Sequence, residues 1–215
     1  MQNKIFIFDT TLRDGTQSEG VSLSCDDMLR IAKKLDEIGI DYIEGGWPGS
    51  NPKDAEFFQR VKGLDLQHAK VSAFGSTCRK DSSPQDDPNI QALVDAETPV
   101  CTVVGKTWTL HVTDILQTTY EENLRMIFDS VEYLIQQGKE VVYDGEHFFD
   151  GYKADKEYAI KTLQAAVRAG AKTVVLCETN GGCMPNEVAD IVREVKSQFP
   201  DTIIGIHAHN DTECA

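Results

Sequence analysis

The sequence predicts an α/β fold, a (β/α)8 barrel that stops after its seventh strand, and three observations carry this prediction. Short apolar segments alternate with amphipathic helical segments along the whole chain, which is the order expected of parallel βα units. Three joints repeat one pattern of helix, glycine, short turn and strand, at Gly39, Gly138 and Gly170. Polar clusters follow at least five of the predicted strands, as in a barrel whose active site is built from many strand ends.

An open doubly wound sheet is the competing arrangement. It is disfavoured because no G-x-G-x-x-G motif follows the first strand, and because polar residues are not confined to one switch point. We therefore expect residues 1–215 to form one catalytic barrel domain. Because the eighth strand would be missing, the sheet would keep two open edges.

Seven strands are expected from short segments rich in β-branched and aromatic residues, at 5–8, 41–44, 69–74, 98–104, 140–143, 173–177 and 202–206. Ser24 and Thr119 should each cap a helix, since an acid follows three positions later. The buried stripe of the first helix should comprise Met28, Ile31, Ala32, Leu35 and Ile38. Other helices are expected at 54–61, 89–95 and 155–169 and from about 185. We expect 81–88 and 144–152 to be polar loops, and 106–118 is ambiguous.

The composition excludes some classes of partner. With 215 residues, 40% hydrophobic and 26% charged, the chain has an ordinary globular composition. A formal charge of -14 argues against nucleic acid or an anionic membrane, which both reward clustered Lys and Arg. The six cysteines, Cys214 included, form no C-x-x-C pair, so reduced thiols are expected. No signal peptide or spanning segment is evident, which predicts a cytoplasmic protein.

The motif His207-x-His209 follows the last predicted strand. Residues i and i+2 of an extended chain point to one side, so both imidazoles can face one point. With a carboxylate they would form a mixed site suited to Mn, Zn, Fe, Co or Mg. Two unrelated surface histidines are the simpler interpretation, but Asn210 and Asp211 directly after the motif favour a site.

Arg13 and Asp14 follow the first predicted strand, in a dense polar cluster that also holds Asp9 and Thr11. In a barrel only the eighth strand separates strands one and seven, so these strand ends would be close. Asp14 could then ligate the same ion, and Arg13 could contact an oxyanion or carboxylate. A surface Arg–Asp pair is the alternative.

Three further carboxylates, Glu44, Glu146 and Glu178, lie at or just beyond predicted strand ends. Each could act as an acid, as a base or as a group that orients a metal-bound histidine. The remaining histidines and the tryptophans are expected in surface, core or pocket-wall positions: His68, His111, His147, Trp47 and Trp108.

The segments DTTLRDGTQ at 9–17 and HAHND at 207–211 together resemble the signature of a family of metal-dependent acyltransferase and lyase barrels. This family includes the 2-isopropylmalate, homocitrate and citramalate synthases and, more distantly, 3-hydroxy-3-methylglutaryl-CoA lyase. The segments 18–22, 42–52 and 146–152 are similar to the citramalate synthase branch. The lyases lack the double threonine before Leu12.

The resemblance implies an acyltransferase that condenses acetyl-CoA with the 2-oxo acid pyruvate to give citramalate and CoA, in isoleucine biosynthesis. It implies a divalent metal (Mn, Zn, Mg or Co) and a homodimer of the full-length protein. It assigns metal ligands Asp14, His207 and His209, catalytic residues Arg13, Glu146 and Thr179, and substrate-binding residues Arg13, Thr179, Gln17 and Tyr143. Residues 1–215 lack the family's eighth strand and C-terminal regulatory regions, and Glu178 stands where relatives more often have Asp.

Three alternatives stay open at this point. The acceptor could be 2-oxoisovalerate or 2-oxoglutarate, as in 2-isopropylmalate or homocitrate synthases, or the enzyme could cleave like the lyases. A two-histidine, one-carboxylate iron oxygenase is disfavoured by the βα order. The chain could also be a silent fragment that binds metal without turnover.

Overall fold

The computed structural model describes residues 4–213, and Cys214 lies outside them. The chain divides into two compact units, unit 1 (Met1–Gly75 and Pro88–Thr102) and unit 2 (Ser76–Asp87 and Val103–Ala215). The sheet neighbours of each strand follow chain order from β1 to β7. A doubly wound sheet would reverse its strand order at a switch point, so the predicted barrel topology is confirmed.

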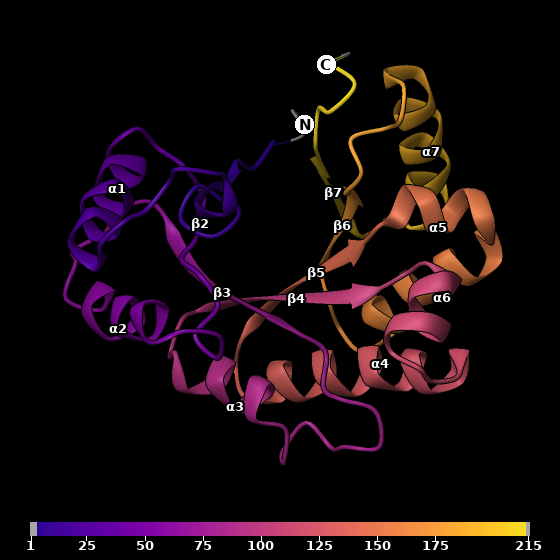
Figure 1. Ribbon diagram of the computed structural model, residues 1–215, viewed down its shortest axis with the longest axis horizontal. Helices are drawn as coiled ribbons and strands as arrows, with labels where there is room; N and C mark the ends of the chain where they lie inside the picture. Colours follow the sequence, from indigo (N-terminus) through magenta and orange to yellow (C-terminus); the bar gives the residue numbers. More distant parts are fainter. Residues whose placement is uncertain (1–3, 214–215) are drawn as a thin grey trace. The chain divides into compact units, whose positions relative to one another are not determined.

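Unit 1 holds three βα repeats. Its elements are β1 (Phe8–Asp9), the single turn η1 (Gly15–Gln17), α1 (Cys25–Glu37), β2 (Tyr42–Glu44), α2 (Pro52–Val61), β3 (Lys70–Ser76) and α3 (Pro88–Asp95). β1, β2 and β3 pair in parallel, and α1 packs against α2 (Figure 1). The core of this unit is apolar and closely packed, with Met28, Ile43 and Phe57 fully buried.

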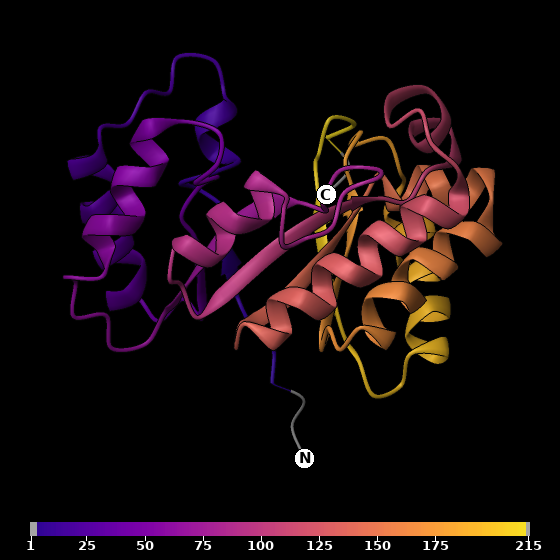
Figure 2. The same cartoon turned by 90° about the horizontal axis from the view of Figure 1, so that it is seen from below.

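The strand β4 (Val100–Lys106) starts in unit 1 and ends in unit 2. Unit 2 continues with the π-helical turn η2 (His111–Ile115), α4 (Tyr120–Gln136), β5 (Glu140–Glu146), α5 (Phe148–Ala154), α6 (Lys156–Arg168), β6 (Thr173–Glu178), α7 (Pro185–Gln198) and β7 (Ile203–Ala208). β5, β6 and β7 pair in parallel. Figures 1 and 2 show α4 and α6 side by side, and these two helices pack together.

The predicted helix ends are confirmed. The Ser24 hydroxyl accepts a hydrogen bond from the Asp27 N–H, and the Asp27 carboxylate accepts one in return from the Ser24 N–H. The Thr119 hydroxyl caps α4 by accepting a hydrogen bond from the Glu122 N–H at 3.2 Å. The helix-ending Gly39, Gly138 and Gly170 all have positive φ, a conformation that costs glycine least.

The first strand differs from its prediction. Ile5–Phe8 was expected to be a buried strand, but the strand covers only Phe8–Asp9, and Ile5 and Ile7 are 81% and 51% exposed. The Ile7 carbonyl accepts from the Tyr42 N–H, so this segment does lie along β2. Within residues 4–213 only β2 flanks β1, which leaves its other edge and its apolar side chains uncovered.

Two predicted polar loops are more ordered than expected. β5 continues to Glu146, and α5 begins at Phe148 because Phe148 and Phe149 are completely buried. In 81–88, Asp87 is buried and its carboxylate accepts from the Arg79 N–H. A buried carboxylate that caps backbone donors is a stable alternative to a solvated loop.

The buried stripe of α1 was predicted correctly at Met28 and Ala32 and wrongly at Ile38, which is 71% exposed. Asp36 is buried near that end of the helix. Its carboxylate accepts hydrogen bonds from the backbone N–H groups of residues 67–69, at 2.7–2.9 Å. This polar anchor fixes the chain before β3.

Removing the cap of α1 should weaken unit 1. Ser24→Ala deletes the hydroxyl that satisfies the Asp27 N–H, and we expect a loss of about 1 kcal/mol of unfolding free energy. Urea unfolding followed by circular dichroism measures this loss. Ser197→Ala, which removes an exposed hydroxyl within α7, is the matched control and should change stability by less than about 0.5 kcal/mol. Equal losses in the two variants would contradict the role of the cap.

Acid should remove the stabilisation supplied by Glu122 in α4. The Arg125 guanidinium, 2.6 Å from its carboxylate, lowers the pKa of Glu122 from 4.5 to about 2. Because the folded pKa lies below the unfolded value, this contribution is complete above about pH 4.5 and is lost as the pH falls towards 2. Glu122→Gln should therefore destabilise most at pH 7 and progressively less below pH 4.5, measured by urea unfolding at each pH. A destabilisation that does not depend on pH would refute this.

Candidate active site

One side of the sheet in unit 2 carries Glu146 and His207, two of the residues predicted for the site, together with further polar residues. In parallel register, Asp144 lies opposite Val175, and Cys177 lies opposite His207. Paired residues share a face and alternate residues return to it, so Asp144, Glu146, Cys177 and His207 occupy one side, which we call the Asp144 face. The structure thus gathers residues from β5, β6 and β7 at their carboxyl ends.

His207 and His209 lie together on the Asp144 face. Their rings stack with centroids 5.5 Å apart and an interplanar angle of 19°. The His209 N–H donates to the Glu178 carbonyl at 3.1 Å, which extends the pairing of β6 and β7 beyond the strand ends. Two imidazoles held side by side are donors that suit a divalent transition metal.

Buried polar groups lie directly beside His207. The ligand atoms of Asp144, Cys177 and His207 lie within 4.8 Å of one another, and Asp144 and Cys177 are both buried. Metal-bound histidines commonly use a neighbouring carboxylate to fix the ring, so Asp144 fits this supporting position. The sequence analysis missed Asp144 because it was assigned to a loop.

Glu146 ends β5 and forms an ion pair with Lys106, the last residue of β4. The Thr107 hydroxyl donates to the Glu146 carbonyl at 2.7 Å. Both charged side chains are about three-quarters buried, with 25% and 27% exposure. The expected acid–base residue therefore has a cationic neighbour that was not predicted.

Thr179 is connected to this cluster through an unusual backbone. His147 has φ +52°, a left-handed conformation that is rare for residues other than glycine. In this conformation its N–H donates to the Thr179 hydroxyl oxygen at 3.0 Å. Because that oxygen already accepts a hydrogen bond, the Thr179 O–H can act as a donor to an anionic ligand.

An aromatic cluster borders Glu146. The His111 ring lies 4.6 Å from that of His147 and 4.9 Å from that of Trp108. Burial lowers the pKa of His111, and His147 and Lys106 add to the effect. His147 is fixed by the Asp150 carboxylate at 3.1 Å. His68, by contrast, is exposed, as predicted.

In unit 1, Arg13 is held on three sides. Its Nε donates to Glu44 at 2.6 Å, a terminal nitrogen lies 3.1 Å from the Asp14 carboxylate, and the guanidinium carbon lies 4.1 Å from the Phe74 ring centroid. Glu44 is fully buried. Burial raises the pKa of Glu44, and the Arg13 charge opposes that rise. Glu44 therefore positions the guanidinium.

The remaining predicted residues lie elsewhere. Tyr143 is fully buried and packs beside Gly105, and strand alternation places it on the face of β5 opposite to Glu146, which lends no support to a substrate-binding role. Gln17 is exposed in η1. The Asp9 carboxylate accepts from Thr11, a local turn contact. Glu178 is buried and accepts from the Gly182 N–H at 3.3 Å.

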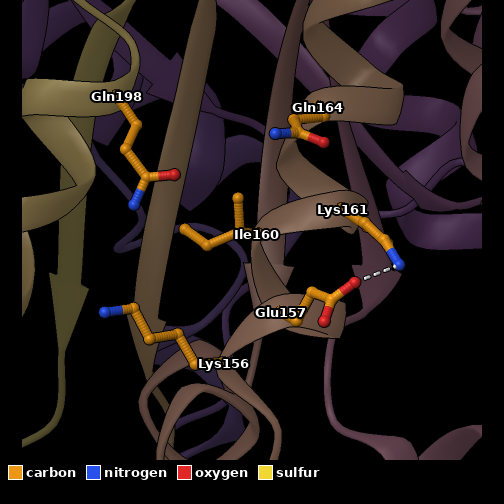
Figure 3. Close-up of a pocket in the computed structure, with 6 residues that line it drawn as sticks. All are labelled: Lys156, Glu157, Ile160, Lys161, Gln164 and Gln198. Carbon is orange, nitrogen blue, oxygen red and sulfur yellow. Dashed lines mark hydrogen bonds and ion pairs between the residues drawn. The ribbon is translucent and has the colours of Figure 1, made fainter.

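A groove of about 520 Å³ lies between α6 and the end of α7 (Figure 3). Its lining contains none of the predicted site residues: Lys156, Glu157, Ile160, Lys161, Gln164 and Gln198. Figure 3 shows the pair of Glu157 and Lys161 at its rim.

The described helices include none that is long and apolar enough to cross a membrane.

Comparison with known proteins decides the family. A profile of the HMGL-like family matches residues 4–215. The chain belongs to the HMGL-like family. Curated relatives include the (R)-citramalate synthase of Aquifex aeolicus, which is 56% identical over 100% of this chain and 41% of that protein. The (R)-citramalate synthase of Geobacter sulfurreducens is 57% identical over 97% of this chain and 39% of that protein. A 2-isopropylmalate synthase of Sulfolobus acidocaldarius is 31% identical over 97% of this chain and 51% of that protein.

Solved structures agree on the fold of this HMGL-like chain. The HMG-CoA lyase of Bacillus subtilis matches 98% of the chain and 70% of its own at a TM-score of 0.77 and 19% identity. An Acinetobacter baumannii HMG-CoA lyase, in complex with coenzyme A and 3-methylmalate, matches 95% of this chain and 66% of its own. The TM-score is 0.75 and the sequence identity is 19%. The chain spans less than half the length of the two citramalate synthases.

Loss of the buried partner of Arg13 should destabilise unit 1. Glu44→Ala leaves the guanidinium without its buried carboxylate, and breaking such a pair costs about 3–5 kcal/mol. Urea unfolding measures the cost. The matched control is Glu56→Ala, which breaks an exposed pair with Arg60 and should cost less than about 1 kcal/mol. A loss at Glu44 as small as the control would show that the pair is not a structural requirement.

Proposed function

We propose that this chain is the catalytic barrel portion of an acyltransferase that condenses acetyl-CoA with pyruvate to give citramalate and CoA. The observation that carries the proposal is the identity of 56% and 57% with two (R)-citramalate synthases across almost the whole chain. Identity with the 2-isopropylmalate synthase is only 31%, which disfavours a larger acceptor. The reaction of the whole protein, its homodimeric state and its cytoplasmic location belong to the same proposal.

Asp14, His207 and His209 would hold a divalent metal, with Mn, Zn, Mg and Co as candidates. The fit rests on the donor set, since the two imidazoles stack on one side and one carboxylate completes a mixed nitrogen and oxygen site. When bound, the ion would polarise the carbonyl of the 2-oxo acid. Asp144 beside His207 would support the ring.

Side chains of the protein would bind the substrate, remove the proton and stabilise the alkoxide. The Thr179 hydroxyl, kept as a donor by the His147 N–H, would hold the pyruvate carboxylate. Glu146 would take a proton from the methyl group of acetyl-CoA. Arg13, fixed by Glu44, would stabilise the alkoxide formed as the new carbon–carbon bond closes. Water would then cleave the thioester and release CoA as its thiol.

Gln17 and Tyr143 complete the proposed assignment. Gln17, which is exposed and whose N–H donates to the Asp14 carbonyl at 2.9 Å, would contribute a substrate contact. Tyr143, fully buried, would act on the substrate only through its neighbours in β5. A silent metal-binding fragment is the competing class, and it differs from the proposal in releasing no CoA.

Replacing the proposed carboxylate ligand tests the function. In the product of the complete reading frame, Asp14→Asn should lower CoA release by at least about 100-fold and weaken Mn²⁺ binding by about 10–100-fold. A thiol assay with acetyl-CoA and a panel of 2-oxo acids measures turnover, and calorimetry measures Mn²⁺ binding. Asp95→Asn, at the end of α3, is the control.

The outcomes separate the candidate functions. Fastest release with pyruvate supports the proposal, whereas fastest release with 2-oxoisovalerate or 2-oxoglutarate would reassign the acceptor. Metal binding without CoA release from any acid would support the silent alternative. Full activity of Asp14→Asn would eliminate this metal site.

A further inference from the structure

Lys106 forms an ion pair with Glu146 and has no role in the proposed reaction as described so far. It is the last residue of β4, and its ammonium group pairs with the Glu146 carboxylate at the end of β5. Both side chains keep about a quarter of their surface exposed. The pair is thus sheltered and still accessible to a substrate.

The surrounding structure fixes this pair through the backbone. The buried Asn123 donates to the Lys106 carbonyl at 2.9 Å and to the Tyr158 hydroxyl at 2.8 Å. From the other side, the Thr107 hydroxyl donates to the Glu146 carbonyl at 2.7 Å. A Cβ on Gly105 would approach the Tyr143 hydroxyl to 2.6 Å, so the end of β4 has little freedom to shift.

This environment differs from that of an ordinary surface ion pair. Lys161 and Glu157 form an ion pair too, with their charged atoms 2.7 Å apart, but their side chains are 50% and 81% exposed. Such exposed pairs contribute little. Lys106 and Glu146 are more buried, and part-buried hydrogen bonds to their backbone carbonyls hold the two strand ends in place, as expected of preorganised catalytic groups.

We infer that Lys106 is a catalytic residue that stabilises the enolate oxygen formed from the acetyl thioester, an inference that rests on the proposed function. When Glu146 takes a proton from the thioester methyl group, a C–H bond breaks and an O–H bond forms on the carboxyl. The electron pair moves to the thioester oxygen. Glu146 becomes neutral in the same step, so Lys106 loses its anionic partner as a new anion forms nearby.

The charge balance distinguishes this role from simple anchoring. Before the step, Lys106 neutralises the Glu146 carboxylate, and after it, the ammonium can donate to the enolate oxygen. When the enolate carbon attacks the 2-oxo carbon, the electron pair on the enolate oxygen re-forms the neutral thioester carbonyl. The negative charge then lies on the former 2-oxo oxygen. The interaction is therefore strongest while charge is on that oxygen, which is the condition for raising kcat.

Kinetics of variants in the product of the complete reading frame test this role. Lys106→Gln should lower kcat by about 10²–10³-fold, as for loss of one oxyanion donor, and change the KM for pyruvate by less than about threefold. The isotope effect with methyl-deuterated acetyl-CoA should rise, since proton removal becomes slower relative to later steps. Lys106→Arg should restore part of kcat, and Lys161→Gln is the matched control that should behave like the unchanged protein.

Each result has a definite meaning. A Lys106→Gln variant that is folded and keeps kcat within about fivefold overturns the inference, as does a fall in kcat without a rise in the isotope effect. If Lys106→Gln does not fold, Lys106→Met, which keeps the length of the side chain without its charge, is judged by the same criteria. Absence of CoA release by the unchanged protein would overturn the proposed function and this inference together.

Discussion

Parallel pairing of β5, β6 and β7 is the constraint on which the rest of unit 2 depends. Because side chains alternate along a strand, the pairing of Cys177 with His207 decides that Thr179 and His209 come next on the same side. A slip of one residue would turn all of these side chains to the opposite face. The register also directs Glu178 away from the Asp144 face. Its carboxylate instead accepts a hydrogen bond from the Gly182 N–H and closes the loop after β6.

Unit 1 keeps its charged centre by a different means. A fully buried carboxylate is unfavourable alone, and Glu44 is tolerated because Arg13 lies against it and Phe74 covers the guanidinium. The orientation of Arg13 is thus set by groups within its own unit. The same principle applies to Asp36, whose carboxylate is satisfied by backbone donors instead of a cation.

The sequence predicted features with a strong local cause, and it missed features that depend on distant contacts. The cap at Ser24, the helix-ending glycines and the repeated βα order follow from local propensity and spacing. α5 was missed because polar residues surround its two buried phenylalanines in the sequence, so the segment was assigned to a loop. Lys106 was missed because its ion-pair partner Glu146 lies 40 residues away along the chain. The left-handed backbone of His147 could not be predicted, because no glycine marks the position. The metal site and the roles of individual residues stay predictions.

The outer strands have a consequence for handling the molecule. Within the described residues β7 pairs only with β6, and it exposes Ile203 and Ile206. An uncovered strand with apolar side chains is a template for adding another strand from a neighbouring molecule. The hydrodynamic radius of a sample limited to these residues would then grow with concentration through edge-to-edge stacking. Light scattering on such a sample would measure this edge-to-edge association.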